Sequence, residues 1–230
     1  MDIDFKIVLI AFIGVWGISR SVVAQQSEML LYEIAGNRYE RQNFDKSGKL
    51  ASRQVLNVGS ITEDENQFRL PVEIIAYNRE GTVQDTTRTI YKCNPEEQNI
   101  FVNIFPYSDY GKGGEIKVKP EDTSSLYPVN PGVGWQMKPI HFEMHINKGL
   151  VGFLGGKSKI KMYNRRVVAN DTLTAGEYEI NSSVNLGVYV MGIKVKGLDY
   201  RVSEVVDRER GLIYQKFRAG DGSYFVIQLQ

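Results

Sequence analysis

The sequence predicts an all-β protein, a single antiparallel meander of roughly ten to twelve strands that closes into an open barrel or cradle. Apolar and polar residues alternate with a period of two along most of the chain, whereas helical periodicity is nearly absent. Short glycine-containing turns separate the alternating runs. These connections are too short for the crossovers that parallel strands need, so we expect consecutive runs to pair antiparallel.

An uncharged apolar run at 7–18 precedes the predicted sheet. A membrane-spanning helix needs about twenty apolar residues, so this run is too short to span. Val22 and Ala24 then supply the small residues that precede a signal-peptide cleavage site. We expect 1–24 to be a signal helix that is cleaved, leaving 25–230 as a single β domain. An uncleaved N-terminal anchor is the alternative, because two acids stand beside the single lysine before the run.

The first half of the β domain contains strands predicted at 38–44, 50–58, 68–77 and 82–92. Alternation is clearest in 68–77, where apolar residues occupy every even position from Phe68 to Ala76. Successive side chains of a strand point to opposite faces, so these residues would form one buried face. The turns between the strands each contain a glycine, as in 45–49 and 78–81.

The second half contains strands predicted at 99–105, 188–195, 200–206, 212–218 and 223–229. In 188–195 we expect Tyr189, Met191, Ile193 and Val195 to line one side of a single strand. A long irregular loop is expected at 106–136, which holds four of the seven prolines. Both faces of 99–105 and 188–195 are partly apolar, which is typical of strands that are covered on both sides.

Composition excludes several classes of function. Lys and Arg total 28 and Asp and Glu total 27, so the net charge of +1 argues against a nucleic-acid-binding protein. The single cysteine excludes an internal disulfide and a cysteine-based zinc site. Phosphate-binding loops, nucleophile elbows and paired-cysteine motifs do not occur in the chain. We therefore expect a protein that is not an enzyme and needs no cofactor.

The segment 141–145 has the sharpest local pattern of metal-ligating side chains. On a strand, His141, Glu143 and His145 would share one face. The two histidines would then be about 13 Å apart, at roughly 3.3 Å per residue, so their imidazoles cannot easily reach one ion. We expect a polar strand face without a metal and keep these three residues as weak candidates.

An apolar, glycine-rich segment at 147–157 is the main candidate for ligand or partner contact. Its large apolar residues, Leu150, Val151, Phe153 and Leu154, would be costly to expose, at about 25 cal/mol per Å² of apolar surface. Lysines flank the segment, an arrangement that suits contact with an anionic lipid surface. The alternative is a loop that folds back over the open end of the barrel. Trp135, in the predicted irregular loop, is a further candidate contact.

Cys93 is a lone thiol at the end of a predicted strand. In an exported chain such a residue can be a buried apolar side chain, half of an intermolecular disulfide or a reactive thiol. The neighbouring Ile90 and Tyr91 favour burial, and the other two states stay open.

Several short motifs follow one another along the chain: Tyr39 before 43–49, then 77–81, 91–93, 134–136, 174–178 and the double hairpin at 205–229. Their order, over roughly 30–229, resembles that of the TapB-like exported proteins of Gram-negative bacteria, a group without assigned function. The resemblance implies an antiparallel β cradle or open barrel, loosely similar to periplasmic lipoprotein-carrier folds, and no catalytic residues. Members often have a second cysteine after the Ala-Gly segment. Residues 178–181 contain none, so any pairing with Cys93 would be lost.

Two functions from different classes remain open. The first is a non-catalytic binding or carrier protein, whose curved sheet holds a hydrophobic small molecule such as a lipid acyl chain. The second is an envelope assembly or interaction protein that docks a partner protein through sheet edges or the 147–157 segment, with peripheral membrane contact as a further option. In both cases we expect an exported protein, in the periplasm or else secreted or on the outer surface. The oligomeric state is left open.

Overall fold

The computed structural model describes residues 34–64, 67–93, 115–120, 131–146 and 157–230, which form a twelve-stranded sheet. The strands are β1 (Arg38–Phe44), β2 (Leu50–Val58), β3 (Thr62–Asp64), β4 (Gln67–Tyr77), β5 (Val83–Cys93), β6 (Glu115–Pro120), β7 (Ile140–Ile146), β8 (Lys157–Val168), β9 (Glu177–Val190), β10 (Ile193–Asp207), β11 (Gly211–Ala219) and β12 (Tyr224–Leu229). The predicted leader, 1–24, and the predicted strand at 99–105 lie outside the described residues.

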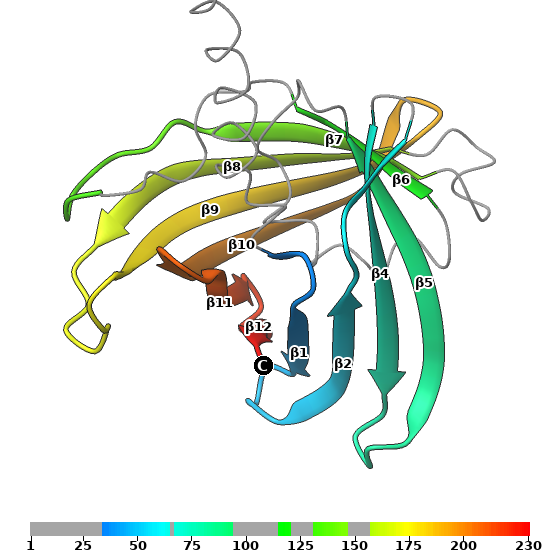
Figure 1. Ribbon diagram of the computed structural model, residues 1–230, viewed down its shortest axis with the longest axis horizontal. Helices are drawn as coiled ribbons and strands as arrows, with labels where there is room; N and C mark the ends of the chain where they lie inside the picture. The colour runs from blue at the N-terminus through cyan, green and yellow to red at the C-terminus, as the bar shows by residue number, and fades with distance from the viewer. Residues whose placement is uncertain (1–33, 65–66, 94–114, 121–130, 147–156) are drawn as a thin grey trace, which may run out of the picture.

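The sheet is the predicted all-β meander curved into an open barrel or cradle. Its order is β2-β1-β12-β11-β10-β9-β8-β7-β6-β5-β4-β3, and β2 also pairs with β4. The pairings therefore run in a circuit that includes every described strand except β3, which extends β4. In Figure 1 the long strands β8, β9 and β10 arch across one side, while β1, β2, β4 and β5 form the other side.

Asparagine and aspartate side chains hold the tight turns of the meander. Asp45 Oδ1 accepts hydrogen bonds from the backbone N–H groups of Ser47 (2.9 Å) and Lys49 (3.0 Å), between β1 and β2. Gly48 completes this turn with a φ of 78°, a conformation that glycine adopts at little cost. Asp221 accepts from the backbone N–H of Ser223 in the same way, at 2.9 Å, between β11 and β12. Local side-chain bonds thus stabilise the turns that the glycine pattern predicted.

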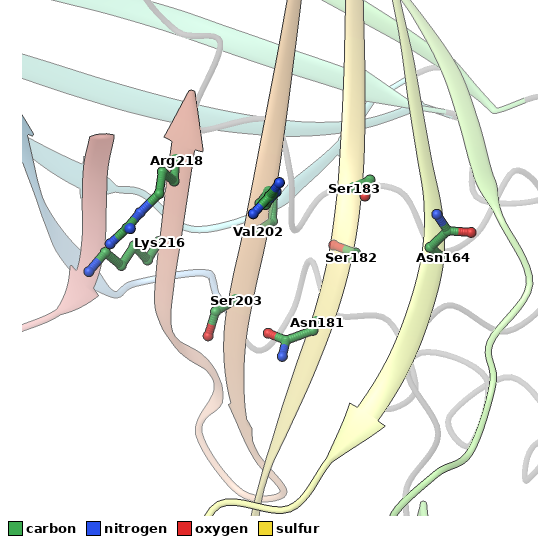
Figure 2. A pocket seen from close by; sticks show the side chains of 9 residues that line it. Asn164, Asn181, Ser182, Ser183, Val202, Ser203, Lys216 and Arg218 are labelled. Carbon is green, nitrogen blue, oxygen red and sulfur yellow. The ribbon is translucent and has the colours of Figure 1, made fainter. Parts of the chain in front are cut away.

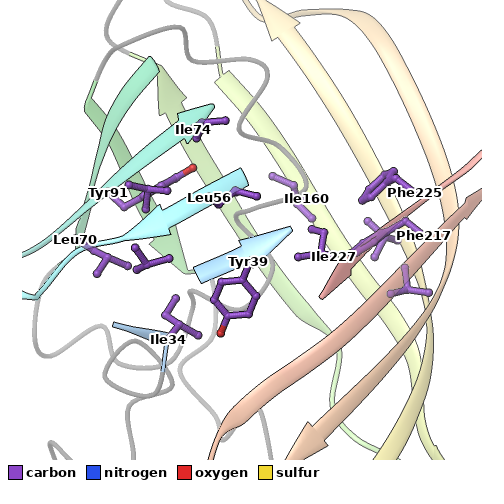
Figure 3. Close-up of a cluster of buried hydrophobic side chains, with 14 of the residues drawn as sticks. Ile34, Tyr39, Leu56, Leu70, Ile74, Tyr91, Ile160, Phe217, Phe225 and Ile227 are labelled. Carbon is purple, nitrogen blue, oxygen red and sulfur yellow. The ribbon is translucent and has the colours of Figure 1, made fainter. Parts of the chain in front are cut away.

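Period-two alternation produces the core. The even positions of β4 from Phe68 to Ile74 are buried, as predicted, and face the inside of the cradle. They belong to a continuous apolar cluster with residues of neighbouring and more distant strands, including Tyr39, Leu56, Ile160, Phe217, Phe225 and Ile227 (Figure 3). Phe217 and Phe225 stack with their ring centroids 4.6 Å apart. Most of the inner face is therefore filled by interlocking side chains.

Polar side chains interrupt this apolar interior. On β10, Glu204 lies between Val202 of the large cluster and Val206 of a second, smaller cluster. Glu204, Gln215 and Arg165 are all buried. The Arg165 Nη1 group donates a hydrogen bond to the Lys138 carbonyl at 3.2 Å. The interior thus contains buried polar side chains that alternation alone does not reveal. Glu204 and Gln215 occupy ordinary inward positions of their strands, whereas Arg165 is turned inward by a register shift of β8 between Tyr163 and Arg166.

The prediction of one strand over 188–195 is wrong. Met191 and Gly192 form a two-residue turn between β9 and β10, with φ angles of 50° and 80°. Positive φ at both turn residues is typical of tight hairpins, where Asn-Gly is the usual sequence. Methionine is a rare residue in this conformation, so the sequence contains only half of the turn signal. Of the side chains expected to line one side of a strand, Met191, Ile193 and Val195 are instead exposed, and Tyr189 is half-buried.

The predicted irregular loop at 106–136 contains β6, which pairs in parallel with β5, as in the match of Ile90 with Glu115. All the other pairings among the described strands are antiparallel. Parallel neighbours require a connection of about a dozen residues or more, and 94–114 provides that length.

Candidate functional site

The predicted contact residues Leu150, Val151, Phe153 and Leu154 lie outside the described residues, but the strands that flank them are described. Lys157, the first residue of β8, pairs with His145 of β7 and with Tyr189 of β9. The turn at Met191 follows two residues after Tyr189. The flanks of the 147–156 segment and the β9–β10 turn are therefore at the same end of the sheet.

Trp135 lies toward the other end of β8. Its backbone carbonyl accepts a hydrogen bond from the Val167 N–H at 3.0 Å, and the indole side chain is 55% exposed. Lys157 and Val167 are ten positions apart on one strand, which corresponds to about 33 Å. The structure thus separates Trp135 from the end at which the 147–156 segment begins.

His141 and Glu143 lie on β7, as expected, but basic side chains surround the carboxylate. Glu143 Oε1 lies 2.8 Å from Lys159 Nζ and 3.5 Å from Lys157 Nζ. The hydrogen bond from Lys159 is the main cause that holds the pKa of Glu143 below its usual value. The His145 side chain is not among those described. In the described part of the chain no group of three metal-ligating side chains converges.

Cys93 is the last residue of β5, where its backbone pairs with Phe68 of β4. Its side chain is outside the description, so burial, intermolecular pairing and reactivity of the thiol all stay open.

An exposed apolar patch occupies the β9–β10 turn and the start of β10. We call residues 191–196 the hairpin tip. Met191, Ile193 and Val195 are 77%, 69% and 60% exposed, and Lys194 and Lys196 alternate with them. A soluble surface rarely presents three large apolar side chains together without a partner. Sequence reasoning missed the tip because the same residues match the alternation of a buried strand.

Two glycines next to the hairpin tip leave room for the side chains of Tyr189 and Lys194 to lie against the sheet. Gly187 of β9 and Gly197 of β10 are direct partners. A Cβ atom on Gly187 would lie 2.8 Å from Tyr189 Cε2, and one on Gly197 would lie 3.0 Å from Lys194 Cε. The ring of Tyr189 and the stem of Lys194 therefore cover these glycines and support the base of the tip.

The outer face next to the hairpin tip is basic. Lys157, Lys159 and Lys161 occupy alternate positions of β8 and so point to the same side of the sheet. Across the strands, Lys157 is level with Tyr189 and, beyond it, with Lys194. Two of the β8 lysines share the carboxylate of Glu143, which leaves this end of the described surface with an excess of positive charge.

A second feature, which we call the outer pocket, lies on the same face nearer the middle of the sheet. It has a volume of about 510 Å³ and is lined by Asn164, Asn181, Ser182, Ser183, Arg201, Val202, Ser203, Lys216 and Arg218. Figure 2 shows how the labelled side chains come from β8, β9, β10 and β11. Sequence reasoning missed this pocket because its residues are single polar positions on four strands, and only strand register brings them together.

Within the described residues no helix is long and apolar enough to cross a membrane.

No protein-family model matches the chain, and no curated protein is significantly similar to it. A candidate exported protein with a YmcC-like fold from Bacteroides fragilis is similar in structure, with a TM-score of 0.45 and 13% identity over 85% of this chain and 94% of that chain. A candidate lipoprotein from Parabacteroides distasonis has a TM-score of 0.45 and 10% identity over 87% of this chain and 96% of that chain. The TapB-like resemblance stays a prediction.

Proposed function

We propose that the protein is an exported, non-catalytic interaction protein that docks on a membrane surface bearing anionic headgroups. The hairpin tip is the docking element. The observation that carries the proposal is the exposure of Met191, Ile193 and Val195 at the end of a two-residue turn. Because these side chains are displayed without cover from the described residues, they are available to enter the boundary between headgroups and acyl chains.

Charge argues for a lipid surface rather than a neutral partner. Lys194 stands between Ile193 and Val195, Lys196 follows Val195, and Lys161 lies on the adjoining outer face. Each basic residue near an anionic leaflet contributes about 1 kcal/mol, and buried apolar area adds about 25 cal/mol per Å². The combination produces weak, reversible docking that salt reduces, because the electrostatic part is screened within about 10 Å at moderate ionic strength.

The alternative function, carriage of a hydrophobic small molecule inside the sheet, has less support. Inward side chains such as Leu70, Ile160 and Phe217 pack against one another. The outer pocket is lined mainly by polar and charged side chains, which suits an acyl chain poorly. Export is proposed from the leader at 1–24, with the periplasm as the location.

Vesicle flotation tests the docking proposal. The protein purified from expressing cells is mixed with vesicles of phosphatidylcholine, with or without phosphatidylglycerol, and the fraction that floats is measured. We expect flotation with the anionic vesicles and little with the neutral ones. The triple variant Met191→Ser, Ile193→Ser, Val195→Ser should lose flotation without unfolding, because all three side chains are exposed.

The matched control is Val133→Ser, which removes an apolar side chain that is 71% exposed outside the hairpin tip. This variant should float like the unchanged protein. The proposal fails if the unchanged protein does not bind anionic vesicles, or if the triple variant binds them equally well. The proposal would also be overturned if a stoichiometric protein partner co-purified with the unchanged protein but not with the triple variant. That result would support docking on a protein instead.

A further inference from the structure

We propose that the outer pocket binds a phosphate-type oxyanion carried on a small organic group. This site is separate from the hairpin tip. Ser182 of β9, which lines the pocket, lies eight residues from Val190, which corresponds to about 26 Å along the strand. The proposal rests on charge, strand register and backbone geometry within the pocket, and it stands or falls independently of membrane docking.

Three cationic side chains lie next to one another in the pocket lining, on two neighbouring strands. Arg201 of β10 and Arg218 of β11 are direct cross-strand partners, and Lys216 lies two positions from Arg218 on the same face. Like charges directly opposite in an antiparallel pair destabilise the sheet. Within the described residues none of the three forms an ion pair. An anion between the two guanidinium groups would remove their repulsion and satisfy both.

Two carboxylates near the pocket accept hydrogen bonds from uncharged side chains. Glu179 accepts hydrogen bonds from Ser203 Oγ at 2.7 Å and from Asn170 Nδ2 at 2.6 Å. Asp199 accepts one from Asn185 Nδ2 at 2.7 Å. These uncharged donors do not neutralise the carboxylates, and Glu179 lies beside Ser203 of the pocket lining. The three cations Arg201, Lys216 and Arg218 outnumber this one carboxylate, so the described pocket keeps a net positive charge.

An aromatic ring holds two of the cations in position. Lys216 Nζ lies 4.7 Å from the centroid of the Tyr224 ring, and the Arg218 guanidinium carbon lies 6.0 Å from it. Phe44 stacks on the same ring, with centroids 4.6 Å apart. A cation over an aromatic face is stabilised but not neutralised, so this stack orients the charges while leaving them available to an anion.

A β-bulge shapes the opposite wall of the pocket. Register shifts between Tyr163 and Arg166, and Asn164 has a φ of 54°. Bulges redirect side chains and occur often beside functional sites. Here Asn164 lines the pocket while Arg165 is buried inside the sheet.

The pocket is larger than a single oxyanion requires. Its volume of about 510 Å³ lies in the range of small-molecule sites, which is about 300–1,000 Å³. Asn164, Asn181 and Ser183 add amide and hydroxyl groups around the cations. Such groups bond the hydroxyls of an attached organic moiety, so a phosphomonoester fits the lining better than free phosphate. The phosphate could belong to a soluble ester or to a lipid headgroup.

Thermal unfolding with added anion tests the site. Inorganic phosphate, glycerol phosphate and sodium chloride are compared at equal ionic strength. We expect both phosphates to raise the unfolding temperature more than chloride, because a ligand that binds the folded state stabilises it. In the double variant Arg201→Gln, Arg218→Gln this response should disappear, and the affinity measured by calorimetry should fall about tenfold or more. Without anion, the double variant should be at least as stable as the unchanged protein.

Arg208→Gln is the matched control, because Arg208 is an exposed arginine in a turn away from the pocket. It should respond to phosphate like the unchanged protein. The proposal is overturned if phosphate acts no differently from chloride, or if the double variant keeps the full response. Vesicle flotation distinguishes the two sources. If the double variant still floats with anionic vesicles, the phosphate belongs to a soluble ester. If the double variant no longer floats, the phosphate belongs to a lipid headgroup.

Discussion

Glu204 of β10 accepts a hydrogen bond from Gln215 of β11 at 2.7 Å, and both side chains are fully buried. The two residues are direct cross-strand partners, so the sheet itself holds them at bonding distance. In the low dielectric of a protein interior such a bond is strong, and a member without its partner is costly.

Replacing Gln215 by leucine should therefore destabilise the protein. Gln215→Leu removes the donor and leaves the Glu204 Oε1 atom buried without it, which costs about 1–3 kcal/mol of unfolding free energy. Urea unfolding measures the change. Gln228→Leu, at an exposed position of β12, should change stability by about 0.5 kcal/mol or less. An equal effect of the two substitutions would contradict a structural role for the buried bond.

The position of Gly59 has no room for a side chain. Its backbone N–H donates to the Pro71 carbonyl at 2.8 Å, and a Cβ atom would lie 2.8 Å from Pro71 Cγ. Gly59→Ala should cost about 1–3 kcal/mol, because the proline ring and its backbone have little room to move. Gly132→Ala is the control, since no atom lies within 4 Å of its Cβ position. Thermal unfolding of the two variants should differ clearly.

Met191 adopts a left-handed backbone conformation, which is unfavourable for methionine. Its φ of 50° precedes Gly192 at 80°, the arrangement for which Asn-Gly is preferred. Met191→Asn should therefore stabilise the hairpin by about 1 kcal/mol, measured by chemical unfolding. Met191→Ala, which removes the same apolar chain without improving the backbone, should not. Stabilisation by alanine as well would mean that relief of apolar exposure, not backbone strain, is responsible.

In the β1–β2 turn, the side chain of Ser47 controls the pKa of Asp45. The hydrogen bond from the Ser47 hydroxyl, at 2.6 Å, is the main cause that lowers the pKa of Asp45 from its ordinary value of 3.8. Ser47→Ala should move this pKa back toward 3.8, as followed by NMR titration. Asp221, which has its own serine partner, serves as the internal control and should titrate unchanged. No shift at Asp45 would contradict the assigned cause.

The same bond has a defined pH dependence. Because the folded protein holds the pKa of Asp45 below 3.8, the unfolded chain binds the proton more readily. The stability that this turn adds is therefore fully present above about pH 4 and is lost as the pH falls through the lowered pKa. Comparison of acid unfolding curves should show that Ser47→Ala flattens the curve below pH 4. A parallel displacement at all pH values would contradict this interpretation.

Sequence patterns over a few residues correctly predicted those strands and turns whose conformation depends on neighbouring residues. Alternation identified the buried face of β4, because burial on one side of a strand requires every second residue to be apolar. Glycine and aspartate identified the turn between β1 and β2, since both act within a few residues of one another. The His141–His145 pattern was also placed correctly on a strand, β7.

Local rules failed where distant pairing decides. The alternating run at 188–195 is divided by a turn, because pairing of β9 with β10 compensates for an unfavourable methionine conformation. The parallel match of β5 with β6 joins segments that no short turn connects. The parallel pairing has no signal within a window of a few residues, and the turn has only Gly192, because Met191 does not match the usual Asn-Gly sequence.

By itself, the sequence determined the all-β class, the inward and outward faces of a strand such as β4, and several turns, because alternation and turn chemistry operate over neighbouring residues. Only the tertiary structure decided which outward residues meet. Arg201 and Arg218 are far apart in the chain, and they oppose each other solely because β10 and β11 pair in one register. Shifting that register by one residue would move either side chain to the other face, so the outer pocket is a property of pairing and not of any single segment.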